Sequence, residues 1–73
     1  MGRIPALSGR QLIRLLERAG FRVLQQRGSH VKLRKADVVV VVPVHGNKSL
    51  KRPTMMGILK DAGLSPDEVA RLL

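Results

Sequence analysis

One histidine in the sequence lies where a β-strand would place it beside two cations. Residues 29–34 (SHVKLR) alternate between polar and apolar side chains, and a strand sends successive side chains to opposite faces. His30, Lys32 and Arg34 are therefore predicted to share one face. Imidazole titrates near neutral pH, and fixed positive charges attract phosphate groups. This pattern favours a phosphodiester as the substrate.

Cleavage of RNA without a metal needs only such groups. A base removes the proton of a 2′-hydroxyl, the oxygen attacks the adjacent phosphorus, and a 2′,3′-cyclic phosphate forms. His30 is the candidate general acid or base, and Lys32 and Arg34 are candidates for stabilising the charge that develops. Ser29 is predicted to point to the opposite face, which favours a role in the turn over one as a nucleophile. A surface histidine that lies near cations by chance is the alternative.

The second of the two histidines, His45, follows a run of valines and Pro43. If the chain forms a hairpin centred on residues 35–37, His45 returns to the end of the sheet that holds His30. Whether the two share a face depends on register, because a shift of one residue reverses every side chain, and Pro43 could cause such a shift through a bulge. An acid–base pair stays open, and a loop histidine that supports the turn is favoured over it.

The acidic residues are too few and too scattered for a two-metal site. Such a site needs several converging carboxylates, and the chain has five Asp and Glu in all. Asp67 and Glu68 suit the first turn of a helix, Glu17 lies in a basic helix, and Asp37 and Asp61 are far apart. We therefore expect no metal and no cofactor.

The charge balance points to a polyanionic partner. Fourteen Lys and Arg against five Asp and Glu give a net charge of +9 on 73 residues, which raises affinity for nucleic acid through counterion release. A merely solvated surface is the alternative. Phe21 is the one aromatic residue, so the stacking platforms of single-strand readers are absent. We expect contacts to phosphate and sugar from Arg10, Arg14, Arg18, Arg27, Lys48 and Lys51.

The first helix has clear start and stop signals. Ser8 and Gln11 form a capping box, and Gly20 fits the left-handed position after the last turn. Arginines at every fourth position, residues 10, 14 and 18, form a cationic stripe on its polar face.

Three strands are predicted to follow, over residues 21–26, 29–34 and 38–42. Phe21 and Val23 would share a face of the first strand, with residues 27–28 as the turn, and residues 35–37 would turn the chain again. The third strand is five consecutive valines continued by Pro43, which restricts it to a sheet edge or a bulge. Because this strand is apolar on both faces, we expect a protein partner or a second copy of the chain to cover the face that helices leave open. Burial by the chain's own loops is the alternative.

Two helices end the chain. The first begins with Pro53 at its first position, presents an apolar face of Met56, Leu59 and Ala62 flanked by Met55 and Ile58, and ends at Gly63. The second is short and runs to Leu73, with a capping box of Ser65 and Glu68.

The chain is expected to fold as a single domain, residues 1–73, near the lower size limit for unaided folding. It has no cysteine and no apolar run near the roughly 18 residues of a membrane span. Residues 1–5 lack the apolar stretch of a signal peptide. We expect a cytoplasmic location and no membrane binding, since the apolar face of the first helix lacks the aromatic residues of interfacial helices.

With these motifs in this order, the chain resembles the HicA (YcfA-like) toxin family of prokaryotic toxin–antitoxin systems. The resemblance covers Ser8 through Leu73 and rests on Ser8-Gly9, Gly20-Phe21, Gly28-Ser29-His30, residues 42–46 (VPVHG) and residues 58–65 (ILKDAGLS).

The resemblance implies an α+β fold like a double-stranded-RNA-binding domain, in which a three-stranded antiparallel sheet carries helices on one face. It also implies a ribonuclease that cuts mRNA (an mRNA interferase), a HicB-type antitoxin as partner, and His30 as the active histidine. Many members have a second histidine directly after the first, where this chain has Val31. A non-catalytic RNA-binding module of the same fold is the main alternative.

Overall fold

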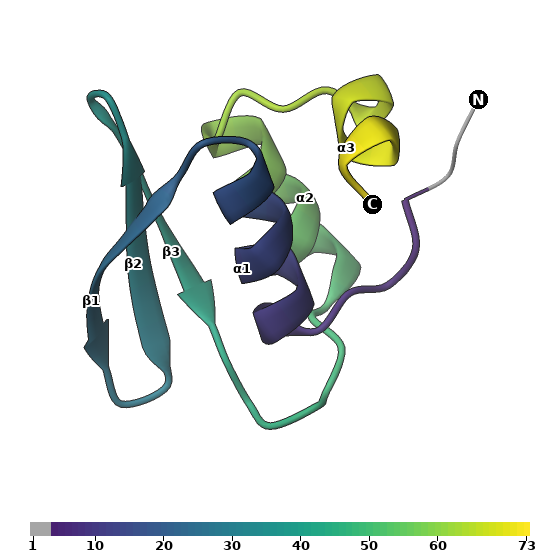
Figure 1. Cartoon of the computed structure of the whole chain (residues 1–73). Helices are drawn as coiled ribbons and strands as arrows, with labels where there is room; N and C mark the ends of the chain where they lie inside the picture. Colours follow the sequence, from purple (N-terminus) through teal and green to yellow (C-terminus); the bar gives the residue numbers. More distant parts are fainter. Residues whose placement is uncertain (1–3) are drawn as a thin grey trace.

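The computed structural model describes residues 4–73, so the first three residues of the expected domain lie outside the described residues. The order is α1 (Gly9–Arg18), β1 (Arg22–Arg27), β2 (His30–Lys35), β3 (Val38–Pro43), α2 (Arg52–Asp61) and α3 (Pro66–Leu72). The strands form one antiparallel sheet in the order β1-β2-β3, and the helices lie on one side of it (Figure 1). The predicted α+β fold is confirmed. None of the helices within residues 4–73 has the length and apolar character that crossing a bilayer requires.

The pairing of β2 with β3 fixes which side chains share a face. The register runs without a break from His30 opposite Pro43 to Lys35 opposite Val38, and residues directly opposite each other point to the same side. One side carries buried residues of both strands, which pack against the helices. We call the other side the outer face; with β1 it consists of Arg22, Gln25, Arg27, His30, Lys32, Arg34, Val39, Val41 and Pro43.

The third strand has the two apolar faces that its valines predict. Val40 and Val42 are buried against the helices, whereas Val39 and Val41 are 48% and 43% exposed on the outer face. No loop within residues 4–73 therefore covers the outer valines. Pro43 ends an edge strand, and no bulge interrupts the register beside it.

The first strand differs from its prediction. Its pairing with β2 shifts between Val23 and Gln25, so Leu24 forms a bulge. Phe21 is buried, but Val23 is 47% exposed although it pairs with the buried Leu33. Phe21 precedes β1, and Val23 faces the inner side of the sheet through its pairing with Leu33 but is not buried there. The reason is that every residue of this edge strand is exposed beyond the helical layer.

The first turn also lies one residue later than expected. Arg27 is the last residue of β1, and the two-residue turn is Gly28-Ser29. Gly28 has φ +54°, a left-handed conformation that two-residue hairpins favour and that glycine adopts without strain.

Capping interactions hold α1 and α3 as the sequence predicts. Ser8 Oγ accepts a hydrogen bond from the Gln11 N–H, and the Gln11 side chain accepts one from the Ser8 N–H. Ser65 and Glu68 form the same reciprocal pair at the start of α3. Each box satisfies backbone donors that the first helical turn leaves free.

The buried side of α2 is rotated from its prediction. Met55, Ile58 and Leu59 are buried, whereas Met56 is 36% exposed. The helix begins at Arg52, so Pro53 is its second residue rather than its first. Both apolar spacings were compatible with a helix, and contact with the sheet selects the side that contains Met55.

Gly9 lets the start of α1 approach the end of β3 closely. A Cβ atom at this position would meet the Pro43 carbonyl oxygen at 2.2 Å and the Val44 Cα at 3.1 Å. Both are backbone atoms that cannot move aside as a side chain would. The helix therefore rests directly on the segment that leads from His30's partner, Pro43, toward His45.

We expect Gly9→Ala to destabilise the protein by about 1–3 kcal/mol, because the methyl group must displace backbone at Pro43. Gly57→Ala is the matched variant: Gly57 lies within α2 with no neighbour in reach of an added Cβ, so alanine should raise stability by about 0.5–1 kcal/mol. Urea denaturation measures both. Stabilisation by both substitutions would contradict the close approach at Gly9.

The α3 capping box predicts a small pH effect. The Ser65 N–H, and after it the Ser65 hydroxyl, lower the pKa of Glu68 from its usual 4.5. A lowered folded pKa means that the stabilisation is present above pH 4.5 and is lost as the pH falls through the folded value. The melting temperature of the wild type should exceed that of Glu68→Gln at neutral pH, and this difference should vanish in acid. A difference that is constant with pH would argue against the effect.

Candidate active site and nucleic-acid-binding face

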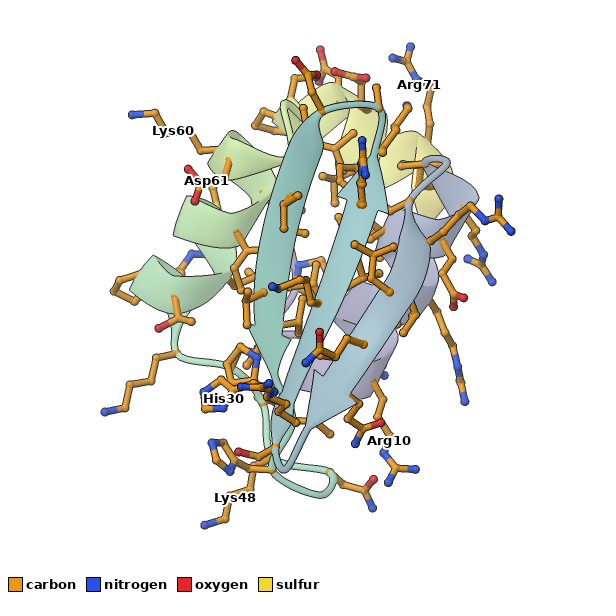
Figure 2. The ribbon with its side chains drawn as sticks, turned by 90° about the vertical axis from the view of Figure 1, so that its left-hand side faces the viewer. Arg10, His30, Lys48, Lys60, Asp61 and Arg71 are labelled. Carbon is orange, nitrogen blue, oxygen red and sulfur yellow. The ribbon has the colours of Figure 1, made fainter. Side chains whose placement is uncertain are left out.

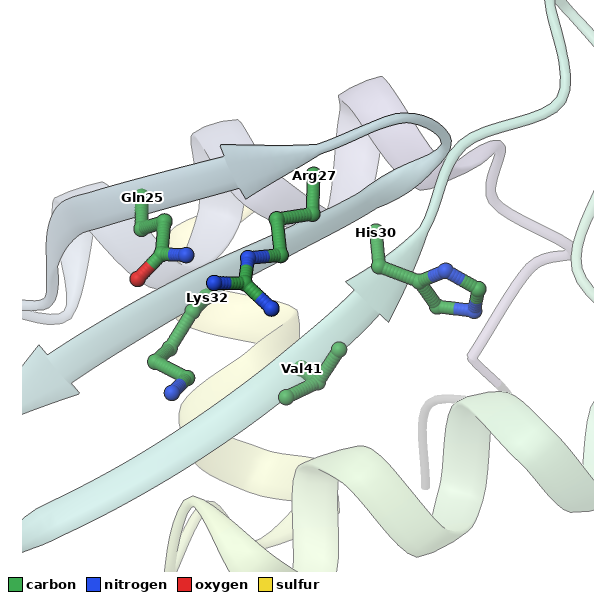
Figure 3. A pocket seen from close by; sticks show the side chains of 5 residues that line it. All are labelled: Gln25, Arg27, His30, Lys32 and Val41. Carbon is green, nitrogen blue, oxygen red and sulfur yellow. The ribbon is translucent and has the colours of Figure 1, made fainter.

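His30 lies in a hollow on the outer face. Gln25, Arg27, His30, Lys32 and Val41 line this hollow, which has a volume of about 310 Å³ (Figure 3). The residues come from all three strands, and the sheet register brings them together. A hollow of this kind is open to a large substrate, because it lies on the surface of the sheet rather than under the helices.

The imidazole of His30 is accessible. His30 is the first residue of β2, directly opposite Arg27 on one side and Pro43 on the other, and it is exposed. Figure 3 shows the Arg27 and Lys32 side chains close together, while His30 lies at one end of the hollow with its ring extending away from them. An imidazole at the edge of a cationic hollow can exchange a proton with a bound ribose or phosphate.

The two cations predicted to share His30's face lie in different places. Lys32 lines the same hollow as His30. Arg34 shares the face but lies two residues beyond Lys32 on β2. Its Nε donates a hydrogen bond to the Ala36 carbonyl. It lines a separate hollow of about 360 Å³. Arg27, predicted only as an RNA-binding cation, is the arginine that lies beside His30.

Ser29 lies in the turn before His30 rather than in the strand. It is half-buried, and its carbonyl accepts a hydrogen bond of 2.6 Å from the Val44 N–H. This bond ties the turn before His30 to the residue before His45. The geometry agrees with a structural role for Ser29.

His45 lies at the same end of the sheet as His30 but in a neighbouring hollow. Its hollow, of about 540 Å³, is lined by Pro43, His45, Lys48, Ser49, Lys51 and Thr54. Because Pro43 is directly opposite His30, the two hollows adjoin at that pair. Figure 2 shows His30 and Lys48 at this end of the molecule.

The loop that carries His45 is held by backbone hydrogen bonds. The Lys48 N–H donates to the His45 carbonyl at 3.1 Å, and the Leu50 N–H donates to the Leu7 carbonyl at 2.8 Å. Ser49 also forms an isolated antiparallel bridge with Ser8. The start of α1 and the His45 loop therefore support each other.

A model of the HicA toxin of bacterial toxin–antitoxin systems matches residues 9–64. The chain belongs to the HicA toxin family. The matched region contains α1, the three strands, α2 and the hollows of His30 and His45, while α3 lies beyond it. A search of curated proteins finds no match to the chain.

The arginine stripe of this HicA-family chain lies apart from the outer face. Arg10 and Arg14 are exposed on α1, which covers the opposite side of the sheet (Figure 1). Arg18 has a structural contact, because its Nη1 donates to the Leu72 carbonyl at 2.8 Å and so ties α1 to the end of α3. Of the six predicted RNA-binding cations, Arg27, Lys48 and Lys51 line the two hollows.

Five outer-face residues were not predicted as site residues: Arg22, Gln25, Val39, Val41 and Pro43. Gln25 and Val41 line the His30 hollow, and Arg22 lies opposite Arg34 at the far end of the face. The side of the sheet to which Gln25 points could not be predicted from the sequence, because the bulge at Leu24 interrupts the alternation of side chains. Val41 could have been placed from the register with Lys32, had the length of the second turn been known. Within residues 4–73, no three His, Asp or Glu side chains gather as metal ligands.

Proposed function

We propose that this HicA-family protein is an endoribonuclease that cuts mRNA without a metal, with His30 as general acid or base. The observation that carries the proposal is the exposed imidazole of His30 in a hollow shared with Arg27 and Lys32. An imidazole sealed between helix and sheet would have excluded the proposal, and the His30 side chain is exposed instead. We infer that residues 1–73 act as a single domain in the cytoplasm, where mRNA is found.

The reaction follows from these groups. As a base, His30 accepts the proton of a ribose 2′-hydroxyl, and the 2′-oxygen forms a bond to the adjacent phosphorus while the bond to the 5′-oxygen breaks. The products are a 2′,3′-cyclic phosphate and a 5′-hydroxyl, whose proton comes from water or from His45 in the adjoining hollow. Lys32 and Arg27 stabilise the negative charge on the phosphoryl oxygens.

The toxin–antitoxin family implies a protein partner, and the outer face suits a HicB-type antitoxin. Exposed Val39 and Val41 lie next to cationic columns on β1 and β2. An acidic partner with apolar residues complements both features and covers His30. A second copy of the chain fits this face less well, because face-to-face pairing would bring its cations against each other.

The first test replaces His30 by alanine. We expect cleavage of single-stranded RNA in EDTA to fall by about 10²–10⁴-fold, the usual contribution of proton transfer, while RNA affinity changes little. Cleavage is measured by gel, with the 2′,3′-cyclic phosphate identified by mass, and affinity by fluorescence anisotropy. His45→Ala removes an imidazole from the adjoining hollow and should lower cleavage less.

Equal loss of binding and cleavage in His30→Ala, with an unchanged melting temperature, would favour the non-catalytic RNA-binding module. Cleavage that stops in EDTA and returns with a divalent cation would contradict the metal-free reaction. Growth arrest on induced expression of wild type, but not of His30→Ala, would link the chemistry to toxicity.

The second test asks whether antitoxin and RNA share the outer face. A 2′-O-methyl RNA, which cannot be cleaved, should displace a HicB-type antitoxin from the toxin, and the antitoxin should displace the RNA. Val41→Lys should weaken antitoxin binding because it removes apolar contact and adds repulsion against any neighbouring cation. A stable ternary complex of toxin, antitoxin and RNA would show that inhibition occurs at a different surface.

A further inference from the structure

We propose that the outer face binds RNA as a single extended strand, whose backbone follows β1 and β2 from His30 to the Arg22–Arg34 pair while its bases lie toward β3. The inference rests on the proposed function and names the substrate form and the residues that hold it. We call this path on the outer face the track. It lies on the sheet, whereas three of the six cations predicted to bind RNA form the arginine stripe of α1.

The outer face repeats one pattern in three rows. Antiparallel pairing places Arg27, His30 and Pro43 in the first row, Gln25, Lys32 and Val41 in the second, and Arg22, Arg34 and Val39 in the third. Every row has at least one cationic or titratable nitrogen side chain on β1 or β2 and an apolar side chain on β3. None of the nine residues is acidic.

The spacing of the rows suits a nucleotide repeat. Successive rows are two residues apart along β2 and β3, about 6.7 Å, so the first and third rows are separated by about 13 Å on these strands. An extended nucleic-acid strand presents one phosphate per nucleotide at a comparable interval. With the reacting phosphate at His30, the next two phosphates reach Lys32 and then the Arg22–Arg34 pair.

The apolar column explains where the bases go. Val39 and Val41 are about half exposed, and Phe21, the one aromatic residue, is buried. Aliphatic side chains offer contact to the faces of ribose and base without hydrogen-bonding to particular base edges. The track therefore holds RNA with little sequence preference beside the reacting group.

The face favours a single strand over a duplex. Three strands at about 4.8 Å spacing give a face about 10 Å wide, and a duplex would set its charged backbones against the exposed valines while hiding its bases. The 2′-oxygen must also attack in line with the departing 5′-oxygen, a geometry that a base-paired helix does not adopt. The separate hollow of Arg34 is also lined by Arg22 and by the exposed Val23 and Leu24. It extends the track past the third row.

The test compares two double variants that change net charge equally. Arg22→Gln with Arg34→Gln removes two cations from the track, whereas Arg10→Gln with Arg14→Gln removes two from α1. Binding of a short 2′-O-methyl RNA single strand is measured by anisotropy over a range of salt. The track variant should bind at least about tenfold more weakly and lower the salt slope by about 0.7, for the one phosphate that the Arg22–Arg34 pair contacts. The α1 variant should change affinity by less than about threefold.

Equal losses in the two double variants would overturn the track, as would tighter binding of a hairpin duplex than of the single strand. Arg34 also donates a hydrogen bond to the Ala36 carbonyl, so Arg22→Gln alone serves as the variant that leaves this turn intact, with about half of the slope change expected. Because the RNA cannot be cleaved, the result is independent of catalysis. The proposed function fails instead if His30→Ala still cleaves natural RNA at the wild-type rate.

Discussion

The continuous register between β2 and β3 is the constraint on which the rest of the structure depends. With His30 opposite Pro43 and Lys35 opposite Val38, the alternating residues of β2 bury Val31 and Leu33 and expose the imidazole and cations. A slip of one residue would place charged side chains under the helices and apolar ones in water. The penalty for burying unpaired charge is large, so the hydrophobic core and the candidate site are specified by the same pairing.

The candidate site is also joined to the core at one end. Gly9 brings α1 against the Pro43 carbonyl, and the Val44 N–H donates to Ser29. The residues that flank both histidines are therefore held by backbone contacts, not by long side chains. Such support holds the backbone of each histidine in place while the ring stays accessible to a substrate. Proton transfer to RNA requires this combination.

The outer face serves two binding partners in our interpretation, for one physical reason. Cations on β1 and β2 attract an anionic ligand, and the exposed valines of β3 give a partner apolar area to cover. An RNA strand and an acidic antitoxin satisfy the same two demands. Inhibition by competition then follows from the shared surface without a conformational change.

The sequence alone determined the features that depend on neighbours in the chain. The capping pairs at Ser8 and Ser65, the two-sided apolar character of β3, and the shared facing of His30 with Lys32 all follow from local spacing. They could be predicted because a helical turn or a strand alternation sets them within a few residues.

Only the tertiary structure decided what depends on distant partners. The pairing of β1 with β2 placed a bulge at Leu24, and contact with the sheet buried Met55 and left Met56 exposed. Arg18 donates a hydrogen bond to the Leu72 carbonyl at the end of α3. The pairing of β1 with β2 brought Arg27 beside His30. These outcomes depend on contacts between residues far apart in sequence, which local periodicity does not encode.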